Sequence, residues 1–258
     1  MRWAREFHRS KPPIHLRKGI AILPSLFTVI NMLCGYTAVI SASRGDFELA
    51  VTLIILAGFL DAVDGRVARL TNTTSEFGVE LDSLTDFLSF GVAPALVLFH
   101  WGFSGPAQPE WLARTGWLFP FLLPVAGAIR LARFNVEARI TDHRNFTGLP
   151  IPMAAAAAVL PLYYLPRDLP DGLKLAALGY VVMLAWFMVS RMKWKSGKSI
   201  DGERSSSTFT VFLLAILVIV VAFRPKPVLL TMALVYVAYG PAIWIVDRIR
   251  SLRRRSAP

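Results

Sequence analysis

The sequence predicts an all-α integral membrane protein with about eight transmembrane helices. Hydrophobic residues make up 55% and charged residues 17% of the 258 positions, and the mean hydropathy is +0.52. Soluble domains carry about 25% charged residues, so this composition is typical of a membrane protein. The expected spans, each near the ~20 residues that cross a bilayer, are residues 19–43, 47–70, 77–102, 115–138, 151–166, 172–190, 208–223 and 227–247.

A basic segment precedes the first span. Residues 1–18 carry six arginine and lysine residues with Trp3 and Phe7 among them, which indicates an arm on the membrane surface. A signal peptide is the alternative, but the run 19–43 is too long for its apolar region and lacks a convincing cleavage site. We expect a cytoplasmic arm over 1–18, a single transmembrane domain over 19–248 and a basic cytoplasmic tail over 249–258.

The basic residues predict the orientation. With the N-terminus inside, the inner segments hold 18 arginines and lysines and the outer segments hold six, the bias expected of cytoplasmic loops. An even number of helices then places both termini in the cytoplasm, as in a multi-pass protein of the cell's inner membrane. The formal charge of +11 comes from loops that face anionic lipids, so nucleic acid is not expected as a partner. Cys34 is the single cysteine, which excludes an intrachain disulfide and a cysteine-rich metal site.

The second and third spans carry aspartates at their facing ends, joined by a short polar loop. Residues three and four apart share one face of a helix. One such face carries Asp61, Asp64, Gly65, Ala68 and Arg69, and a second carries Gly78, Asp82 and Asp86. A carboxylate in or beside hydrocarbon costs several kcal/mol, so four together require a compensating charge. If the two helices are antiparallel neighbours, the two faces meet across a short gap.

Four carboxylates on facing helices suit one or two hard divalent ions, since Mg²⁺ and Mn²⁺ prefer oxygen ligands. Gly65 and Gly78 each cost about 1 kcal/mol relative to alanine within a helix, and they leave clearance for a bulky ligand. Ala68 adds another small side chain on the same face, and Arg69 can pair with a phosphate through two hydrogen bonds. The hypothesis is therefore a site that holds metal against the pyrophosphate of a lipid-linked nucleotide.

Two other interpretations of these residues stand beside that hypothesis. The aspartates could pair with Arg66 and Arg69 at a helix end, although two arginines cannot neutralise four aspartates and the glycines then have no role. They could also line an ion or proton pathway in a transporter. Such a pathway normally spreads acids over several helices, whereas the other spans of this chain are nearly free of them.

The eight residues follow the pattern Asp-x2-Asp-Gly-x2-Ala-Arg-x8-Gly-x3-Asp-x3-Asp without a departure. In this pattern the chain resembles the CDP-alcohol phosphatidyltransferases, and the resemblance spans about residues 20–165. Within that family the chain is most similar to the integral-membrane CDP-diacylglycerol–serine O-phosphatidyltransferases, or phosphatidylserine synthases, through the stretches 24–35, 89–95, 130–135 and 146–152. The last three predicted helices contain no motif of the family.

The resemblance implies the family's fold, a catalytic role for the transmembrane domain and a reaction in which the hydroxyl of L-serine attacks the β-phosphorus of CDP-diacylglycerol, releasing CMP. It implies Mg²⁺ or Mn²⁺ held by Asp61, Asp64 and Asp82, with Asp86 both near a metal and placed as the catalytic base. The residues that it implies around the CDP group are Asp61, Asp64, Gly65, Ala68, Arg69 and Gly78, with Asn31 and Thr28 framing the pocket. Members of the family tend to be homodimers, so a second copy and membrane lipids are the expected partners.

Selection of serine requires paired charges for its carboxylate and its ammonium group. Arg130 and Arg133 lie one turn apart at the inner end of the fourth span, followed by Asn135. One arginine is expected to bind the acceptor carboxylate and the other a lipid phosphate. The alternative is that both only flank a membrane helix and extend to its surface. Residues 148–152 either shape this pocket or end a loop, and His143 before them is expected to be solvated.

Several alternatives to the serine reaction stay open. The same chemistry could use another acceptor, such as glycerol 3-phosphate or an inositol phosphate, or an ether-lipid donor. A metal-ion transporter and a catalytically silent membrane scaffold are the alternatives from other classes. No cysteine or histidine is suitably placed as a nucleophile, so the reaction is expected to be a direct displacement without a phosphatidyl-enzyme intermediate.

Overall fold

The computed structural model describes residues 14–71, 75–104, 110–140, 146–166, 169–194 and 220–255. The α-helices in these ranges are α1 (Ile14–Ser43), α2 (Phe47–Thr71), α3 (Glu76–Asp86), α4 (Ala93–Leu98), α5 (Glu110–Thr115), α6 (Leu118–Ile140), α7 (Ile151–Val159), α8 (Asp171–Val189) and α10 (Pro225–Arg255). The π-helical segment η1 (Phe87–Val92) joins α3 to α4, and a second one, η2 (Phe99–Phe103), continues α4, so that the four form one continuous rod. The 3₁₀ segment η3 (Leu160–Tyr163) extends α7.

The predicted all-helical membrane fold is confirmed in its main features. Among the described residues, five helices are long and apolar enough to cross a membrane: Leu26–Ser43, Glu76–Phe103, Leu118–Glu137, Asp171–Val189 and Pro225–Ser251. Helix α2 is 25 residues long but carries two aspartates and two arginines in its second half, and the apolar helix Ile151–Tyr163 is shorter. The number of eight spans stays a prediction, because most of the expected seventh span, 208–223, lies outside the described residues.

Two details differ from the sequence-based boundaries. Helix α1 begins at Ile14, within the expected N-terminal arm, and α10 continues to Arg255 through most of the expected tail. A two-residue antiparallel pairing between β1 (Phe146–Thr147) and β2 (Lys193–Trp194) was not predicted. Strands this short leave no alternation in the sequence, so only the folded chain reveals them.

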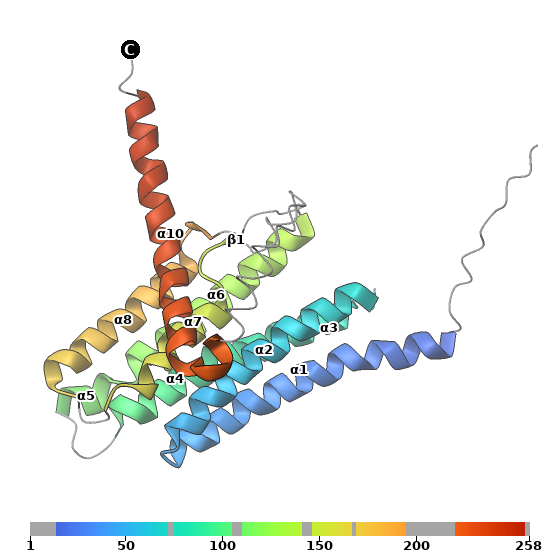
Figure 1. The fold of residues 1–258 in the computed structure, drawn as a ribbon, viewed down its shortest axis with the longest axis horizontal. Helices are drawn as coiled ribbons and strands as arrows, with labels where there is room; N and C mark the ends of the chain where they lie inside the picture. The colour runs from blue at the N-terminus through green and yellow to red at the C-terminus, as the bar shows by residue number, and fades with distance from the viewer. Residues whose placement is uncertain are drawn as a thin grey trace, which may run out of the picture.

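Helices α1, α2 and α3 lie side by side, and α6 and α8 pack against each other on the other side of the bundle (Figure 1). The turn from α1 to α2 passes through Gly45, whose φ of 83° is in the left-handed region that favours glycine. The carboxylate of Asp46 then accepts a hydrogen bond of 3.0 Å from the Leu49 amide and caps the start of α2. The acidic second half of α2 thus returns alongside α1.

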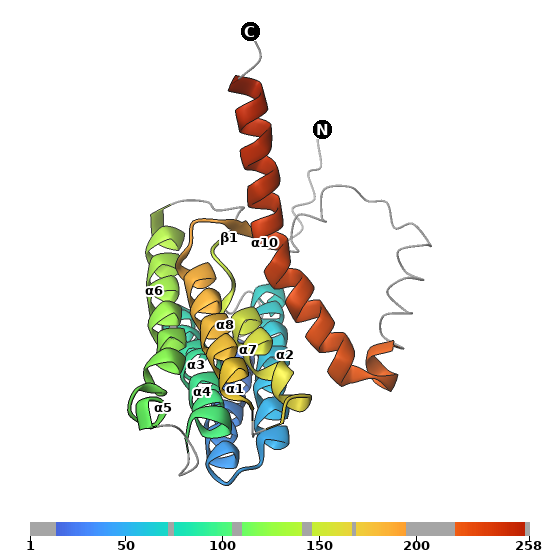
Figure 2. The ribbon, with the colours of Figure 1, turned by 90° about the vertical axis from the view of Figure 1, so that its left-hand side faces the viewer.

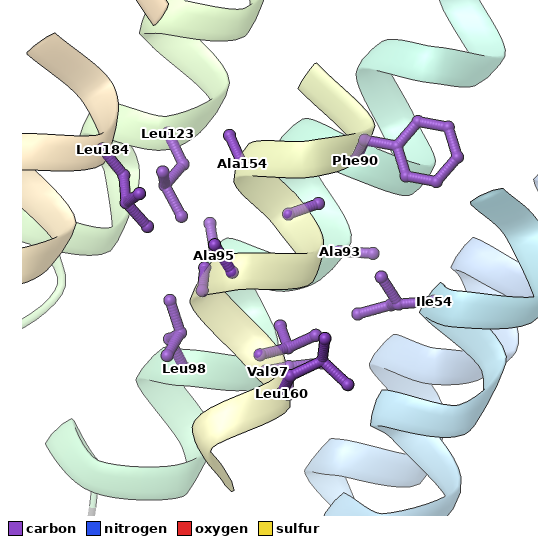
Figure 3. Close-up of a cluster of buried hydrophobic side chains, with 14 of the residues drawn as sticks. Ile54, Phe90, Ala93, Ala95, Val97, Leu98, Leu123, Ala154, Leu160 and Leu184 are labelled. Carbon is purple, nitrogen blue, oxygen red and sulfur yellow. The ribbon is translucent and has the colours of Figure 1, made fainter. Parts of the chain in front are cut away.

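Helix α7 lies at the centre of the hydrophobic core (Figure 3). Its alanines Ala154, Ala155, Ala157 and Ala158 are each at most 2% exposed, and such small side chains let helices approach closely. A Cβ atom at Gly127 of α6 would lie 2.6 Å from Ile151 Cδ1. Helix α7 therefore packs closely against α6.

The rod from α3 to η2 changes its hydrogen-bonding pattern directly after Asp86. The Ala93 amide donates to the Leu88 carbonyl, five residues back, and Pro94 has no amide hydrogen to continue an α-helical pattern. This π-helical segment places Ser89 against α1, where its hydroxyl donates to the Asn31 carbonyl over 3.2 Å. On its other side Gly91 packs on Pro124 of α6. Helices α1, α3 and α6 are thereby held together around the acidic residues.

Candidate active site

The two acidic helix faces meet as the sequence predicts. Three carboxylate oxygens lie within 4.8 Å of one another: one from Asp61 of α2, and one each from Asp82 and Asp86 of α3. All three side chains are partly accessible. Because like charges so close repel strongly in a low-dielectric surrounding, the cluster calls for a compensating cation.

The fourth aspartate has different surroundings. Asp64 is 5% exposed, and its Oδ2 accepts a hydrogen bond of 2.5 Å from the hydroxyl of Thr28 on α1. Its carboxylate is not one of the three that come within 4.8 Å of each other. The structure therefore brings Asp61, Asp82 and Asp86 into one cluster and places Asp64 at its buried edge, adjoining α1.

The donor atoms of this cluster fit a hard divalent cation. Asp86 Oδ1 is buried and has no hydrogen-bond partner among the described residues, and a buried oxygen without a partner is costly unless something binds it. Three carboxylates with an unpaired oxygen match the oxygen-only ligand sets of Mg²⁺ and Mn²⁺. Among the described side chains, no ion pair joins Arg66 to these aspartates, and Arg66 is exposed. That weakens the proposed pairing of the acids with Arg66, while the Arg69 side chain lies outside the described part of the structure.

The residues expected around the nucleotide divide into two groups. Gly65 is exposed on α2, and Gly78 is partly exposed on α3, where its amide donates to the hydroxyl of the N-cap residue Ser75 over 3.0 Å. Gly78 thus also belongs to the helix start, a role that the motif alone did not suggest. Ala68 and Arg69 lie in the last turns of α2, and their side chains are outside the described part of the structure.

The two residues expected on α1 are both buried beside this site. Thr28 is 5% and Asn31 1% exposed, and Asn31 Oδ1 has no partner among the described groups. The Asn31 carbonyl holds Ser89, which lies three residues beyond Asp86. Helix α1 therefore contacts both acidic helices, through Thr28 to α2 and through Asn31 to the rod that carries Asp86.

The two arginines of α6 differ in their partners. Arg130 is 8% exposed, interacts electrostatically with Asp86 and leaves its Nε without a hydrogen bond in the described structure. Arg133 donates from Nη1 to the Val189 carbonyl, at the end of α8, over 3.0 Å. Asn135 pairs with Ser83 of α3, donating to its hydroxyl over 3.1 Å. Arg130 therefore lies at the acidic cluster, whereas Arg133 and Asn135 connect helices.

The remaining predicted features near this end of the bundle are loop residues. Gly148 has a φ of 82°, and a Cβ atom there would lie 2.3 Å from the Met188 carbonyl. The amides of Gly148 and Leu149 donate to the carbonyls of Met192 and Phe187. This stretch thus fastens the loop to the end of α8, while His143 lies outside the described residues. Sequence reasoning also gave no part to Tyr236 of α10, which lies within electrostatic range of Arg130 and belongs to no motif.

Known proteins match the chain over most of its length. The family model described as CDP-alcohol phosphatidyltransferase matches residues 21–192. A CDP-diacylglycerol–serine O-phosphatidyltransferase of Helicobacter pylori (strain J99) is 36% identical over 228 residues, which cover 87% of this chain and 91% of that protein. The protein of the same name from Bacillus subtilis is 32% identical over 72% of this chain and 96% of its own length. An archaetidylserine synthase of Methanothermobacter thermautotrophicus is 32% identical over 72% of this chain and 73% of its own. On these matches and on its complete acidic motif, the chain belongs to the CDP-alcohol phosphatidyltransferase family.

Proposed function

We propose that this chain transfers a phosphatidyl group from CDP-diacylglycerol to the hydroxyl of L-serine, forming phosphatidylserine and CMP. The observation that carries the proposal is the meeting of Asp61, Asp82 and Asp86 on two membrane-protein helices. The family of the chain and the names of its relatives support CDP-diacylglycerol and L-serine as the substrates. The carboxylate cluster supports the dependence on Mg²⁺ or Mn²⁺.

The aspartates are proposed to have unequal roles. Asp61, Asp64 and Asp82 would hold the metal, with Thr28 orienting Asp64 through its hydroxyl. Bound metal would compensate negative charge on the pyrophosphate oxygens and on the departing CMP. Asp86 keeps one buried oxygen free of hydrogen bonds, which supports a carboxylate that ligates metal and also takes up a proton.

The proposed reaction is a direct displacement. The serine oxygen forms a bond to the β-phosphorus, the bond from that phosphorus to the CMP oxygen breaks, and the hydroxyl proton passes to the carboxylate of Asp86. A serine hydroxyl is a weak nucleophile at neutral pH, so such a base contributes a rate factor of roughly 10²–10⁴. Gly65, Ala68, Arg69 and Gly78, with Asn31 nearby, are the residues proposed to accommodate the CDP group.

Arg130 is the residue proposed to bind the serine carboxylate. Its guanidinium is buried and lies within electrostatic reach of Asp86, so an acceptor held by its carboxylate would present its hydroxyl near the base. Arg133 and Asn135 are proposed to act on the acceptor or on a lipid phosphate, with the hydrogen bonds to Val189 and Ser83 fixing their positions.

The proposed membrane arrangement has eight spans in the cell's inner membrane, with both termini and the acidic cluster on the cytoplasmic side. The bias of 18 inner against six outer basic residues supports it. Serine and CMP are water-soluble, so a cytoplasmic site lets both exchange while the acyl chains stay in the bilayer. In this arrangement two copies form a homodimer. Each chain consists of a cytoplasmic arm (1–18), a transmembrane domain (19–248) and a basic cytoplasmic tail (249–258).

A second candidate keeps the chemistry and changes a substrate. The archaetidylserine synthase among the relatives favours an ether-lipid donor as one such change. Glycerol 3-phosphate and inositol phosphate are the competing acceptors, because each carries an anionic group that Arg130 could bind.

The test is release of CMP by the purified full-length chain. CDP-diacylglycerol and its ether analogue are each supplied with serine, glycerol 3-phosphate or inositol phosphate, in Mn²⁺, in Mg²⁺ or in EDTA. Metal-dependent release with serine alone is the expected result. Release with another acceptor supports the second candidate, and release with none, at any metal, rules out the enzyme. A labelled covalent lipid adduct trapped with CDP-diacylglycerol alone would contradict direct displacement.

A further inference from the structure

The short helix α5 lies at the end of the bundle away from the acidic cluster. It follows η2, the last segment of the rod whose first helix carries Asp86. From Asp86 to Phe103 the rod rises about 25 Å at ~1.5 Å per residue, which is close to the ~30 Å of hydrocarbon in a bilayer. Figure 2 shows α5 beside the lower end of α6, whereas α10 projects from the opposite end of the bundle. Helix α5 and the acidic cluster therefore belong to opposite surfaces of the membrane.

One side of α5 is fixed to the bundle. Leu112 is buried and forms a small hydrophobic cluster with Phe103 of η2 and Leu178 of α8. The turn from α5 into α6 passes through Gly116, where a Cβ atom would lie 2.5 Å from the Leu112 carbonyl oxygen and 3.2 Å from Phe103 Cβ. A larger residue would displace this turn from the bundle. The segment from α5 to the start of α6 thus has a defined place.

The same segment carries two exposed tryptophans. Trp111 is 48% and Trp117 51% exposed, and the Trp117 indole Nε1 donates to the Arg114 carbonyl over 3.0 Å. Trp117 is continuous with an apolar stripe on α6, a candidate membrane span on which exposed apolar residues recur three and four positions apart. The stripe consists of Leu118, Phe121, Leu122, Val125 and Ile129. In a membrane this stripe faces the acyl chains, so the tryptophans lie where that surface ends. An indole, with an apolar body and a polar N–H, suits the boundary between hydrocarbon and headgroups.

The charged residues at this end of the bundle balance one another. Arg114 pairs with Glu110 one turn earlier, and their side chains are 75% and 79% exposed. At the start of α8, the ammonium of the buried Lys174 lies 3.5 Å from the exposed carboxylate of Asp171. A lysine with a buried stem and an exposed partner extends from hydrocarbon toward water. These two pairs indicate that water begins beside α5, and they leave α5 without a net charge that would attract anionic lipids.

We propose that α5 and the turn after it form an interfacial anchor, which lies in the headgroup layer of the leaflet opposite the acidic cluster. Trp111 and Trp117 would lie at the boundary with the acyl chains. Helix α5 has six residues and is too short to span a bilayer, but a short helix with charged and aromatic sides can lie in the interface. The partner is the lipid, recognised by its boundary between polar and apolar groups and not by headgroup charge. The anchor would set the depth of α6 and of the rod, and with them the depth of the acidic cluster at the other surface.

Depth-dependent fluorescence quenching of the full-length chain tests this placement. Cys34 is the single cysteine and is buried, so Cys34→Ser provides a background for one labelled cysteine at a time. Trp111→Cys and Trp117→Cys are labelled with a fluorescent dye in phosphatidylcholine vesicles that carry a nitroxide either near the headgroup or deep in the acyl chains. We expect the headgroup nitroxide to quench both labels more strongly. Ile129→Cys, further along the stripe on α6, is the matched control and should show the reverse order.

Leu118→Cys keeps both tryptophans, so it measures the same depth if a substituted tryptophan prevents folding, and it should respond like Trp117→Cys. Adding phosphatidylglycerol or salt should leave the order of quenching unchanged, because α5 carries no net charge. Labels that only a water-soluble quencher reaches would overturn the proposal. So would labels that neither nitroxide reaches, which would show that a second copy or another part of the chain covers α5. Quenching that requires phosphatidylglycerol would contradict recognition without headgroup charge.

Discussion

The Thr28 hydroxyl donates a hydrogen bond of 2.5 Å to Oδ2 of Asp64, joining α1 to α2 at the edge of the acidic cluster. Both side chains are 5% exposed. A hydrogen bond to a buried carboxylate fixes its orientation, and an oriented carboxylate binds metal better than a mobile one. Helix α1 thus contributes to the site although it carries none of the four aspartates.

Replacing Thr28 by valine keeps the shape of the side chain and removes the donor. We expect the Mn²⁺ concentration for half-maximal activity to rise about tenfold, because Asp64 loses the partner that orients it. The measurement is CMP release against free metal concentration. The control is Thr52→Val, which removes an exposed hydroxyl bonded to Tyr163 and should leave the metal requirement unchanged. Equal metal requirements in all three proteins would contradict the role given to Thr28.

Replacing Asp86 by asparagine tests its role as a base separately from its role in binding. The amide cannot take up the serine proton, so turnover is expected to fall by roughly 10²–10⁴-fold, while much of the binding of CMP with metal is kept by the other three aspartates. Single-turnover CMP release and calorimetric CMP binding measure the two effects. Glu76→Gln, an exposed acid at the start of the same helix, should change neither. A strong loss of both properties in Asp86→Asn would show that base and ligand roles cannot be separated.

The two arginines of α6 are expected to respond differently to replacement by lysine. Arg133 donates to the Val189 carbonyl at the end of α8, where a cation favours the helix terminus. Arg133→Lys keeps the charge but loses the planar group, so we expect a loss of about 1 kcal/mol in stability and a small change in the serine KM. Arg130→Lys should raise the serine KM strongly. Serine titrations and thermal unfolding in detergent distinguish these outcomes, and an identical response of both variants would refute the assignment.

The acidic cluster could be predicted from the sequence because it depends on the spacing of residues that are close together in the chain. Positions three and four apart share a helix face, so the spacing from Asp61 to Asp86 was enough to predict that the two helices bring their carboxylates together. The hydrogen bond from Thr28 to Asp64 was not predictable in this way. The two residues are 36 positions apart, and no periodicity reports such a contact.

The other differences between the sequence-based predictions and the structure also come from long-range packing or from single residues. The hydrophobic pattern does not distinguish the π-helical turn before Pro94 from an α-helix, because both turn apolar residues toward the core. The partner of Arg133 is 56 residues away, and the Trp194 indole donates to the Tyr236 carbonyl 42 residues further along the chain. The lengths of the apolar runs predicted where the helices lie. Asp61, Asp64 and Arg66, however, make α2 too charged to be identified as a membrane span by length and composition alone.

Gly35 is predicted to be a position on α1 that tolerates no side chain. A Cβ atom there would lie 2.5 Å from Ser89 Oγ and 2.9 Å from Ser89 Cα, so α1 and the rod behind Asp86 would have to move apart. Gly35→Ala should therefore lower the free energy of unfolding by about 1–3 kcal/mol and reduce activity through the displaced Asp86.

The control is Gly58→Ala on α2, where the new Cβ would meet only Phe90 Cε1 at 3.7 Å, an ordinary contact. Since alanine favours a helix over glycine by about 1 kcal/mol, Gly58→Ala should leave the thermal midpoint unchanged or raise it. Adding Ser89→Ala to Gly35→Ala should not restore stability, because the clash with the Ser89 backbone remains. Thermal unfolding in detergent measures all three proteins. Equal midpoints for Gly35→Ala and wild type would mean that α1 does not pack this closely on the helix that carries Asp86.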